Sequence, residues 1–147
     1  MQKFQFKLQR LLDFRKIREE QARAEFAKAT RVFLHEKEQL RQLEKKLTNT
    51  LEGLKLEQEK TSSLLMLKMF QDYIDTTREG IQLQTTRVAA AAEKRQKCLK
   101  LFEETARQRK IVDKLREKKL EQYQEEVLHE EQAFLDDLAG QRYIRDS

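Results

Sequence analysis

The residue types that usually perform chemistry are scarce in this sequence and stand far apart. The two histidines, His35 and His129, are separated by most of the chain, and no nucleophilic residue stands beside a general base. Metal and acid–base sites need several side chains that converge on one point. There is also no glycine-rich loop of the kind that binds phosphate. We therefore expect no catalytic residue, no metal and no cofactor, and we predict that the protein is not an enzyme.

The single cysteine, Cys98, is a further candidate for chemistry. One cysteine excludes an intramolecular disulfide and a multi-cysteine metal site, which agrees with a reducing compartment. We interpret Cys98 as a small residue in a helix contact. The alternative is a reactive thiol, because Lys97 and Lys100 stand close to it and positive charge favours the thiolate.

The basic residues between Arg107 and Lys119 could contact phosphate groups, and the formal net charge of the chain is +5. Acidic residues such as Asp113 and Glu117 are interspersed among them, which is typical of a solvated helix surface that pairs its own charges. No groove-reading motif accompanies the charge, so we expect no nucleic-acid binding. A basic nucleic-acid-binding rod, or a general coiled-coil scaffold, is the alternative function.

The composition indicates that long helices must carry any functional surface. Of 147 residues, 39% are charged, none is proline and only 3 are glycine. Such a chain cannot bury most of its residues in a compact core, but it can bury one stripe along a helix. Alternating steps of four and three residues from Leu8 to Leu54 meet apolar residues at most positions, as in a heptad seam. We predict a first helix from about residue 5 to about residue 59.

A break between two helices is predicted at residues 60–63, because Ser and Thr favour helix starts over helix interiors. A turn at Thr61 and Ser62 lets a second helix, from about residue 64 to about residue 139, return antiparallel to the first. Facing residues then have numbers that add to about 123. This register places in the contact the second-helix residues Met69, Leu83, Ala90, Leu101, Ile111 and Leu115.

The predicted fold class is therefore all-α: a long two-helix antiparallel coiled-coil hairpin that forms a single domain over residues 1–147. In this register, residues after about Lys119 have no partner on the first helix and form a C-terminal helical overhang. The overhang carries seven acidic residues from Glu121 to Asp137, with no lysine or arginine among them. An uncovered apolar face is expected to bind another chain, and these acidic residues favour a basic partner. The apolar stripe of the overhang consists of Leu120, Tyr123, Val127, Phe134 and Leu138.

The densest apolar cluster follows the predicted turn. We expect it to seal the tip of the hairpin, with the alternative that part of it is exposed for a partner. The cluster consists of Leu64, Leu65, Met66, Leu67, Met69 and Phe70.

Neither a signal peptide nor membrane insertion is expected, because residues 1–20 lack an apolar stretch and no uncharged run is long enough to span a bilayer.

Three segments, taken in order, resemble the flagellar export protein FliJ family. The first is Phe4-x-Phe6-x-Leu8-Gln9-x-Leu11-Leu12-x-x-Arg15, with Glu20, Ala22 and Glu25 after it. The second is Phe70-Gln71-x-Tyr73-Ile74. The third is Leu115-Arg116-Glu117-Lys118-Lys119, followed by Tyr123, Glu126, Glu130-Glu131-Gln132 and Leu135-Asp136-Asp137-Leu138. Each segment alone is common in coiled coils, but together they span nearly the whole chain.

The resemblance implies a soluble, non-catalytic component of the flagellar type III export apparatus, cytoplasmic and peripherally associated with the inner membrane at the flagellar base. Members of the family resemble the central stalk of rotary ATP synthases and bind the hexameric export ATPase through their joined N- and C-terminal ends. They contact the cytoplasmic region of the export gate protein FlhA nearer the middle of the hairpin, and they help to escort export chaperones. The stalk subunit of a virulence secretion system shares this fold and is an alternative.

The resemblance also implies which residues bind each partner. The implied export-gate contacts are Gln39, Leu43 and Tyr73. The chain departs from the family pattern near them, with Lys46 and Thr50 where aromatic residues are usual and Gly80 where a larger residue is usual. The implied ATPase-binding residues are Phe4, Phe6, Leu8, Leu12, Arg15, Leu120, Tyr123 and Val127.

Overall fold

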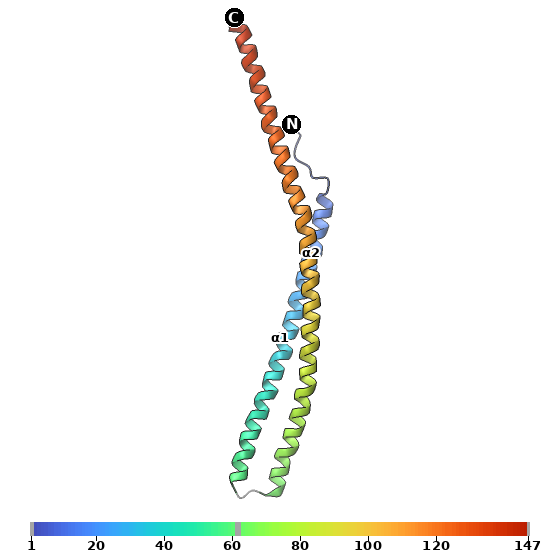
Figure 1. Ribbon diagram of the computed structural model, residues 1–147, viewed down its shortest axis with the longest axis vertical. Coiled ribbons are helices and arrows are strands. Elements are labelled where there is room, and N and C mark those ends of the chain that lie inside the picture. The colour runs from blue at the N-terminus through green and yellow to red at the C-terminus, as the bar shows by residue number, and fades with distance from the viewer. Residues whose placement is uncertain (1, 61–62, 147) are drawn as a thin grey trace. The chain divides into compact units, whose positions relative to one another are not determined.

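The computed structural model describes residues 2–60 and 63–146, and these ranges contain two helices and no strand. Helix α1 spans Gln9–Glu59 and helix α2 spans Leu64–Asp146. Figure 1 shows the ribbons of α1 and α2 running in opposite directions, with parts of the two helices side by side. The prediction of an all-α, two-helix antiparallel hairpin is confirmed. The turn predicted at Thr61 and Ser62 lies outside the described residues.

The ends of the helices have local causes. The hydroxyl of Ser63 accepts a hydrogen bond from the backbone N–H of Met66 at 3.2 Å, so Ser63 caps the start of α2. Helix α1 begins at Gln9 rather than near residue 5, and the N–H of Gln9 donates to the carbonyl of Phe6 at 3.1 Å. Helix α2 continues past residue 139 to Asp146, since no proline and no glycine with positive φ ends it earlier.

The chain divides into two compact units, each built from parts of both helices. The terminal unit comprises Met1–Glu20 and Glu103–Ser147, and the hairpin unit comprises Gln21–Phe102. The single domain expected over residues 1–147 stays a prediction.

The hairpin unit buries small apolar residues and a few satisfied polar ones. Ile74 is 1% exposed, and the rings of Phe26 and Phe102 stack with centroids 6.2 Å apart. The buried Gln84 of α2 donates a hydrogen bond to the backbone carbonyl of Glu36 on α1 at 2.9 Å and also bonds the Glu36 carboxylate. The guanidinium of Arg95 lies over the ring of Phe26 and donates to the hydroxyl of Thr30 at 3.1 Å. Such contacts tie the antiparallel helices together at polar positions of the seam.

The face of α2 that packs against α1 differs from the predicted one. In the hairpin unit, Leu83 is 57% exposed whereas its neighbour Gln84 is only 5% exposed. In the terminal unit, Ile111 is 61% exposed whereas Val112 is 3% exposed. A shift of one residue turns a helix by about 100°, so the predicted set of facing residues was wrong although the antiparallel pairing was right. Polar residues of α2, such as Gln84, enter the seam because α1 supplies their hydrogen-bond partners. The helix therefore turns a different face towards α1 than its apolar pattern predicts.

The glycines of the two helices offer a test of this packing. Replacing Gly80 by alanine is expected to stabilise the protein by about 0.8 to 1 kcal/mol, because glycine is a poor helix former and nothing lies within 4 Å of an added Cβ. A Cβ at Gly53 would lie 3.2 Å from the Cε1 atom of Phe70, so Gly53→Ala should gain less. Thermal unfolding followed by circular dichroism measures both. Equal gains for the two variants would contradict the close packing of Phe70 on Gly53.

Candidate functional site

The N-terminal segment before α1 packs onto α2 in the terminal unit. The rings of Phe4 and Tyr123 lie 5.5 Å apart at 48°, and the Tyr123 hydroxyl donates a hydrogen bond to the carbonyl of Gln2 at 2.6 Å. The guanidinium of Arg116 lies 5.6 Å from the centre of the Phe4 ring and donates through Nε to the side-chain oxygen of Gln9 at 3.2 Å. The overhang was expected to lack a partner after Lys119, but this segment covers it as far as Tyr123.

Two of the residues assigned to ATPase binding hold the terminal unit together. Leu12 is only 1% exposed, and Val112 and Thr105 of α2 are also buried in this unit. Arg15 is half-buried, and its Nη1 donates a hydrogen bond to the backbone carbonyl of Gln108 at 2.8 Å. A partner could reach Leu12 only if α1 and α2 moved apart.

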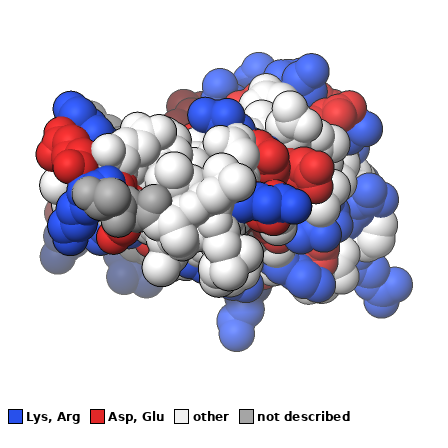
Figure 2. All heavy atoms as spheres, turned by 90° about the horizontal axis from the view of Figure 1, so that it is seen from below, with Lys and Arg blue, Asp and Glu red and all other residues white. Residues whose placement is uncertain are grey.

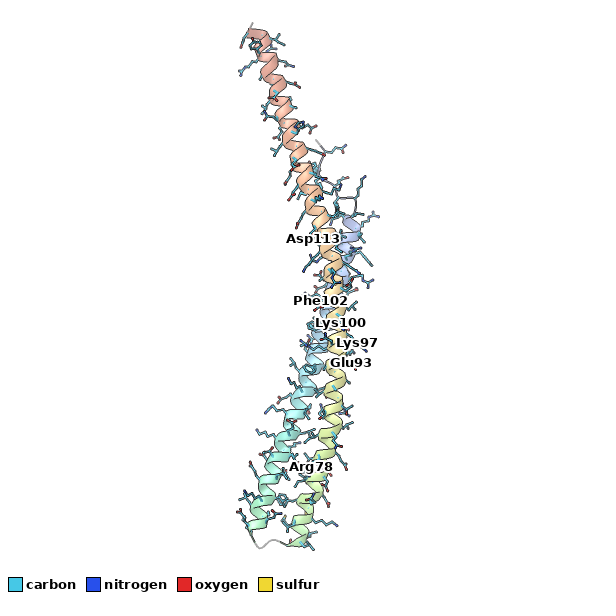
Figure 3. All side chains as sticks on the ribbon, viewed as in Figure 1. Arg78, Glu93, Lys97, Lys100, Phe102 and Asp113 are labelled. Carbon is cyan, nitrogen blue, oxygen red and sulfur yellow. The ribbon has the colours of Figure 1, made fainter. Side chains whose placement is uncertain are left out.

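An ion-pair cluster centred on Arg109 adds a second tie between the two helices of the terminal unit. The Nε of Arg109 donates to the carboxylate of Glu19 on α1. Its Nη1 donates at 2.9 Å to Asp113 on α2, which is labelled in Figure 3. The hydrogen bond with Glu19 raises the pKa of the Arg109 guanidinium above its ordinary value. This pairing could not be read from the sequence, because Glu19 and Arg109 are 90 positions apart in the chain.

A shallow groove runs between the N-terminal segment and α2. Phe4 and Phe6 are half-buried and Leu8 is 40% exposed, so apolar surface faces the groove. Lys119 and Glu126 also line it, which gives it both signs of charge. Its lining residues are Gln2, Lys3, Phe4, Gln5, Phe6, Lys7, Leu8, Leu115, Lys119, Gln122, Tyr123, Glu126 and Glu130.

Beyond the groove, the last part of α2 is uncovered. Leu120 and Val127 are half-buried, whereas residues 128–146 are all exposed. Large apolar side chains stand out from this stretch beside the acidic residues. They are Leu128, Phe134, Leu135, Leu138, Tyr143 and Ile144, with exposed fractions from 45% to 77%.

The three residues assigned to the export gate all belong to the hairpin unit. Gln39 and Leu43 are half-buried on α1, and Tyr73 of α2 is 49% exposed. Met66 and Met69, which precede Tyr73 by seven and four residues, share its helix face and are also exposed. An apolar stripe on α2 is therefore open to solvent next to Tyr73.

The apolar cluster at residues 64–70 was expected either to seal the tip of the hairpin or to be partly exposed for a partner, and its side chains divide between these two roles. Leu67 and Phe70 are half-buried, and Phe70 packs on Gly53, whereas Leu64 is 83% exposed and Leu65 is 70% exposed. The end view in Figure 2 shows uncharged side chains gathered in the middle of this face, with charged ones around them. Part of the cluster seals the tip of the hairpin unit and part faces solvent.

The remaining candidates for chemistry lie apart from one another. His35 and His129 are both exposed, and the part of the chain that the structure describes contains no group of three or more side chains that could hold a metal ion. Cys98 is half-buried in the hairpin unit. On the same stretch of α2, Lys97 forms an exposed ion pair with Glu93 at 3.5 Å (Figure 3).

Within residues 2–60 and 63–146, no helix is long and apolar enough to cross a membrane.

Two long helices with uncovered apolar stripes are typical of coiled-coil proteins that bind other proteins along their length. A family model described as Flagellar FliJ protein matches residues 4–147. The chain therefore belongs to the FliJ family, and it is a component of the flagellar export apparatus. Comparison with curated proteins and with solved structures gave no match.

Proposed function

We propose that this protein is a non-catalytic adaptor of the flagellar export apparatus that works through two binding surfaces. The terminal unit binds the hexameric export ATPase as a subunit similar to a central stalk. The hairpin unit contacts the cytoplasmic region of the export gate protein FlhA, and the protein also escorts export chaperones. It acts in the cytoplasm, at the membrane face where the flagellum is assembled.

The observation that carries this proposal is the uncovered end of α2. Phe134 is 64% exposed and Leu138 is 45% exposed on a helix that has no partner in this part of the described chain. Large exposed apolar residues cost free energy in water, so a helix face of this kind is expected to be covered by another chain. The acidic residues that surround the stripe favour a partner with basic side chains, because complementary charge speeds and orients association.

The packing of the terminal unit divides the assigned ATPase-binding residues into three groups. Phe4, Phe6 and Leu8 line the groove with Tyr123, and a partner can reach them from solvent. Leu12 and Arg15 support these residues from inside the unit by packing and by the hydrogen bond to Gln108. Leu120 and Val127 continue the apolar surface from the groove towards the uncovered end of α2.

The gate surface is supported by exposure alone. Tyr73 projects from α2 beside Met69, which is 60% exposed, and neither side chain is needed to fill the seam. Gln39 and Leu43 are only half-buried on α1, so they also offer surface to a partner. A hairpin held between a ring and a gate can change the conformation of either one only by binding its conformations with different affinities.

A parallel binding experiment tests the proposal. The full chain is immobilised, and a flagellar export ATPase and the cytoplasmic domain of FlhA are passed over it separately at low salt. Both are expected to bind, and addition of the chain in solution is expected to raise ATP turnover by the ATPase. Duplex DNA serves as the control for non-specific charge. Binding to DNA alone, with strong salt dependence, would instead support the basic nucleic-acid-binding rod.

A further inference from the structure

The side of α2 that faces away from α1 in the terminal unit carries an ordered row of charges. We name it the outer face; it consists of Arg107, Lys110, Lys114, Lys118, Glu121 and Glu125. Spacings of three and four residues keep these side chains on one face of a helix. All of them are exposed, whereas Val112 and Thr105 on the opposite side are buried in the core. The outer face is therefore basic up to Lys118 and acidic from Glu121 onward.

Neighbouring side chains in this row carry like charges, which weaken a lone helix. Lys110, Lys114 and Lys118 follow one another at four-residue spacing, and so do Glu121 and Glu125. Like charges at that spacing destabilise a helix by about 0.2 to 0.5 kcal/mol per pair. Arg107 is paired with Glu104 at 2.7 Å, but the three lysines form no ion pair with any residue that the structure describes. An occupant of opposite charge would relieve this repulsion.

We propose that a second copy of this chain binds antiparallel along the outer face. Because the sign of the charge changes between Lys118 and Glu121, a two-fold axis at that point brings the last two lysines of each outer face opposite the two glutamates of the other. Facing residue numbers then add to about 239, with Lys118 against Glu121 and Lys114 against Glu125, twice in each dimer. The same register brings Ile111 level with Leu128, and these two side chains are 61% and 65% exposed.

Other occupants fit only half of this surface. A nucleic acid or an anionic lipid surface would be attracted by Lys110, Lys114 and Lys118 but repelled by Glu121 and Glu125. A basic protein would meet the opposite difficulty. A second copy pairs Lys114 and Lys118 with the two carboxylates of the other chain, and its affinity is expected to be weak and sensitive to salt, because the ion pairs are exposed.

The dimer does not depend on the function proposed above. Tyr123, Val127 and Phe134 lie on the side of α2 opposite to the outer face, since residues about half a turn apart point in opposite directions. A chain that pairs through its outer face therefore keeps this apolar stripe open. Self-association can fail while ATPase binding succeeds, and the reverse outcome can occur as well.

Charge reversal tests the proposal in solution. Sedimentation equilibrium of the full chain at low salt is expected to show a reversible dimer that weakens by about tenfold when salt is raised from 50 to 500 mM. The variant Lys114→Glu with Lys118→Glu should self-associate at least tenfold more weakly, and so should Glu121→Lys with Glu125→Lys. Mixing these two variants should restore dimers, because each outer face then meets one of opposite charge. Lys45→Glu with Lys46→Glu, in the hairpin unit, is the matched control and should dimerise as the unchanged chain does.

Two results would overturn the proposal. A chain that stays monomeric at about 100 μM and low salt has no such interface, because even weak specific pairs associate at that concentration. Failure of the mixed variants to pair, with circular dichroism showing both to be helical, would also exclude it.

The antiparallel arrangement is tested by a distance. A nitroxide spin label is placed on Gln132→Cys in a chain that also carries Cys98→Ala. With a rise of 1.5 Å per residue, the register predicts about 40 Å between the two labels of a dimer. A parallel pair would bring the labels to within about 10 Å of each other, and that result would contradict the two-fold axis near Lys118.

Discussion

Replacing Leu12 by alanine is expected to lower the free energy of unfolding of the terminal unit by about 2 to 5 kcal/mol. The side chain is 1% exposed and lies in a core shared with Val112. That core is small, so few neighbours can move to fill the cavity. Amide hydrogen exchange should show faster opening around Leu12, and thermal unfolding followed by circular dichroism should shift to lower temperature.

The matched control is the same substitution at Leu34, which is 56% exposed on α1. Leu34→Ala is expected to change stability by no more than about 0.5 kcal/mol, because little apolar area is lost to solvent at a surface position. If both variants unfold alike, Leu12 does not form the core of the terminal unit. The comparison matters for function, because a loss of ATPase binding in a Leu12 variant would then reflect unfolding rather than a lost contact.

The number, type and direction of the helices could be predicted because they depend on short-range features of the sequence. The absence of proline and the heptad spacing from Leu8 to Leu54 indicate a long helix. Ser63 indicates the start of the second, and its hydroxyl caps that helix. These signals act within a few residues, so no tertiary information was needed to read them.

The rotation of α2 could not be predicted from apolar content. Choosing the most apolar positions favoured Leu83 and Ile111, both of which are exposed. The structure instead buries Gln84, because Glu36 on the other helix supplies acceptors for its amide. Whether a polar residue can enter a seam depends on the partner across it, and that partner is known only when the register is known.

The candidate site could likewise be predicted only in part from the sequence. The apolar stripe from Leu120 to Phe134 could be found by its period, because one helix alone determines it. The packing of Phe4 on Tyr123 could not, because it joins residues that are distant in the sequence through a segment without regular structure. The sequence therefore indicated where a partner could bind but not which of the assigned residues the chain already uses for its own core.

Placing a charge on each proposed surface should separate the two binding functions. Phe134→Asp is expected to weaken binding to the export ATPase by tenfold or more, because burying an unpaired carboxylate in an apolar contact is costly. The same variant should bind the FlhA domain normally. Tyr73→Asp should show the opposite pattern, with loss of gate binding and unchanged ATPase binding. Titration of each variant against both partners measures the four affinities.

The design relies on the exposure of both side chains in the free chain. Phe134 is 64% exposed and Tyr73 is 49% exposed, so neither substitution removes a core residue and both variants should keep the helical content of the unchanged chain. Equal losses for both partners in either variant would contradict the division of labour between the terminal unit and the hairpin unit. Because Phe134 lies on α2 beyond the part covered by the N-terminal segment, a selective effect there would also assign the uncovered end of that helix, rather than the groove beside Phe4, to the ATPase contact.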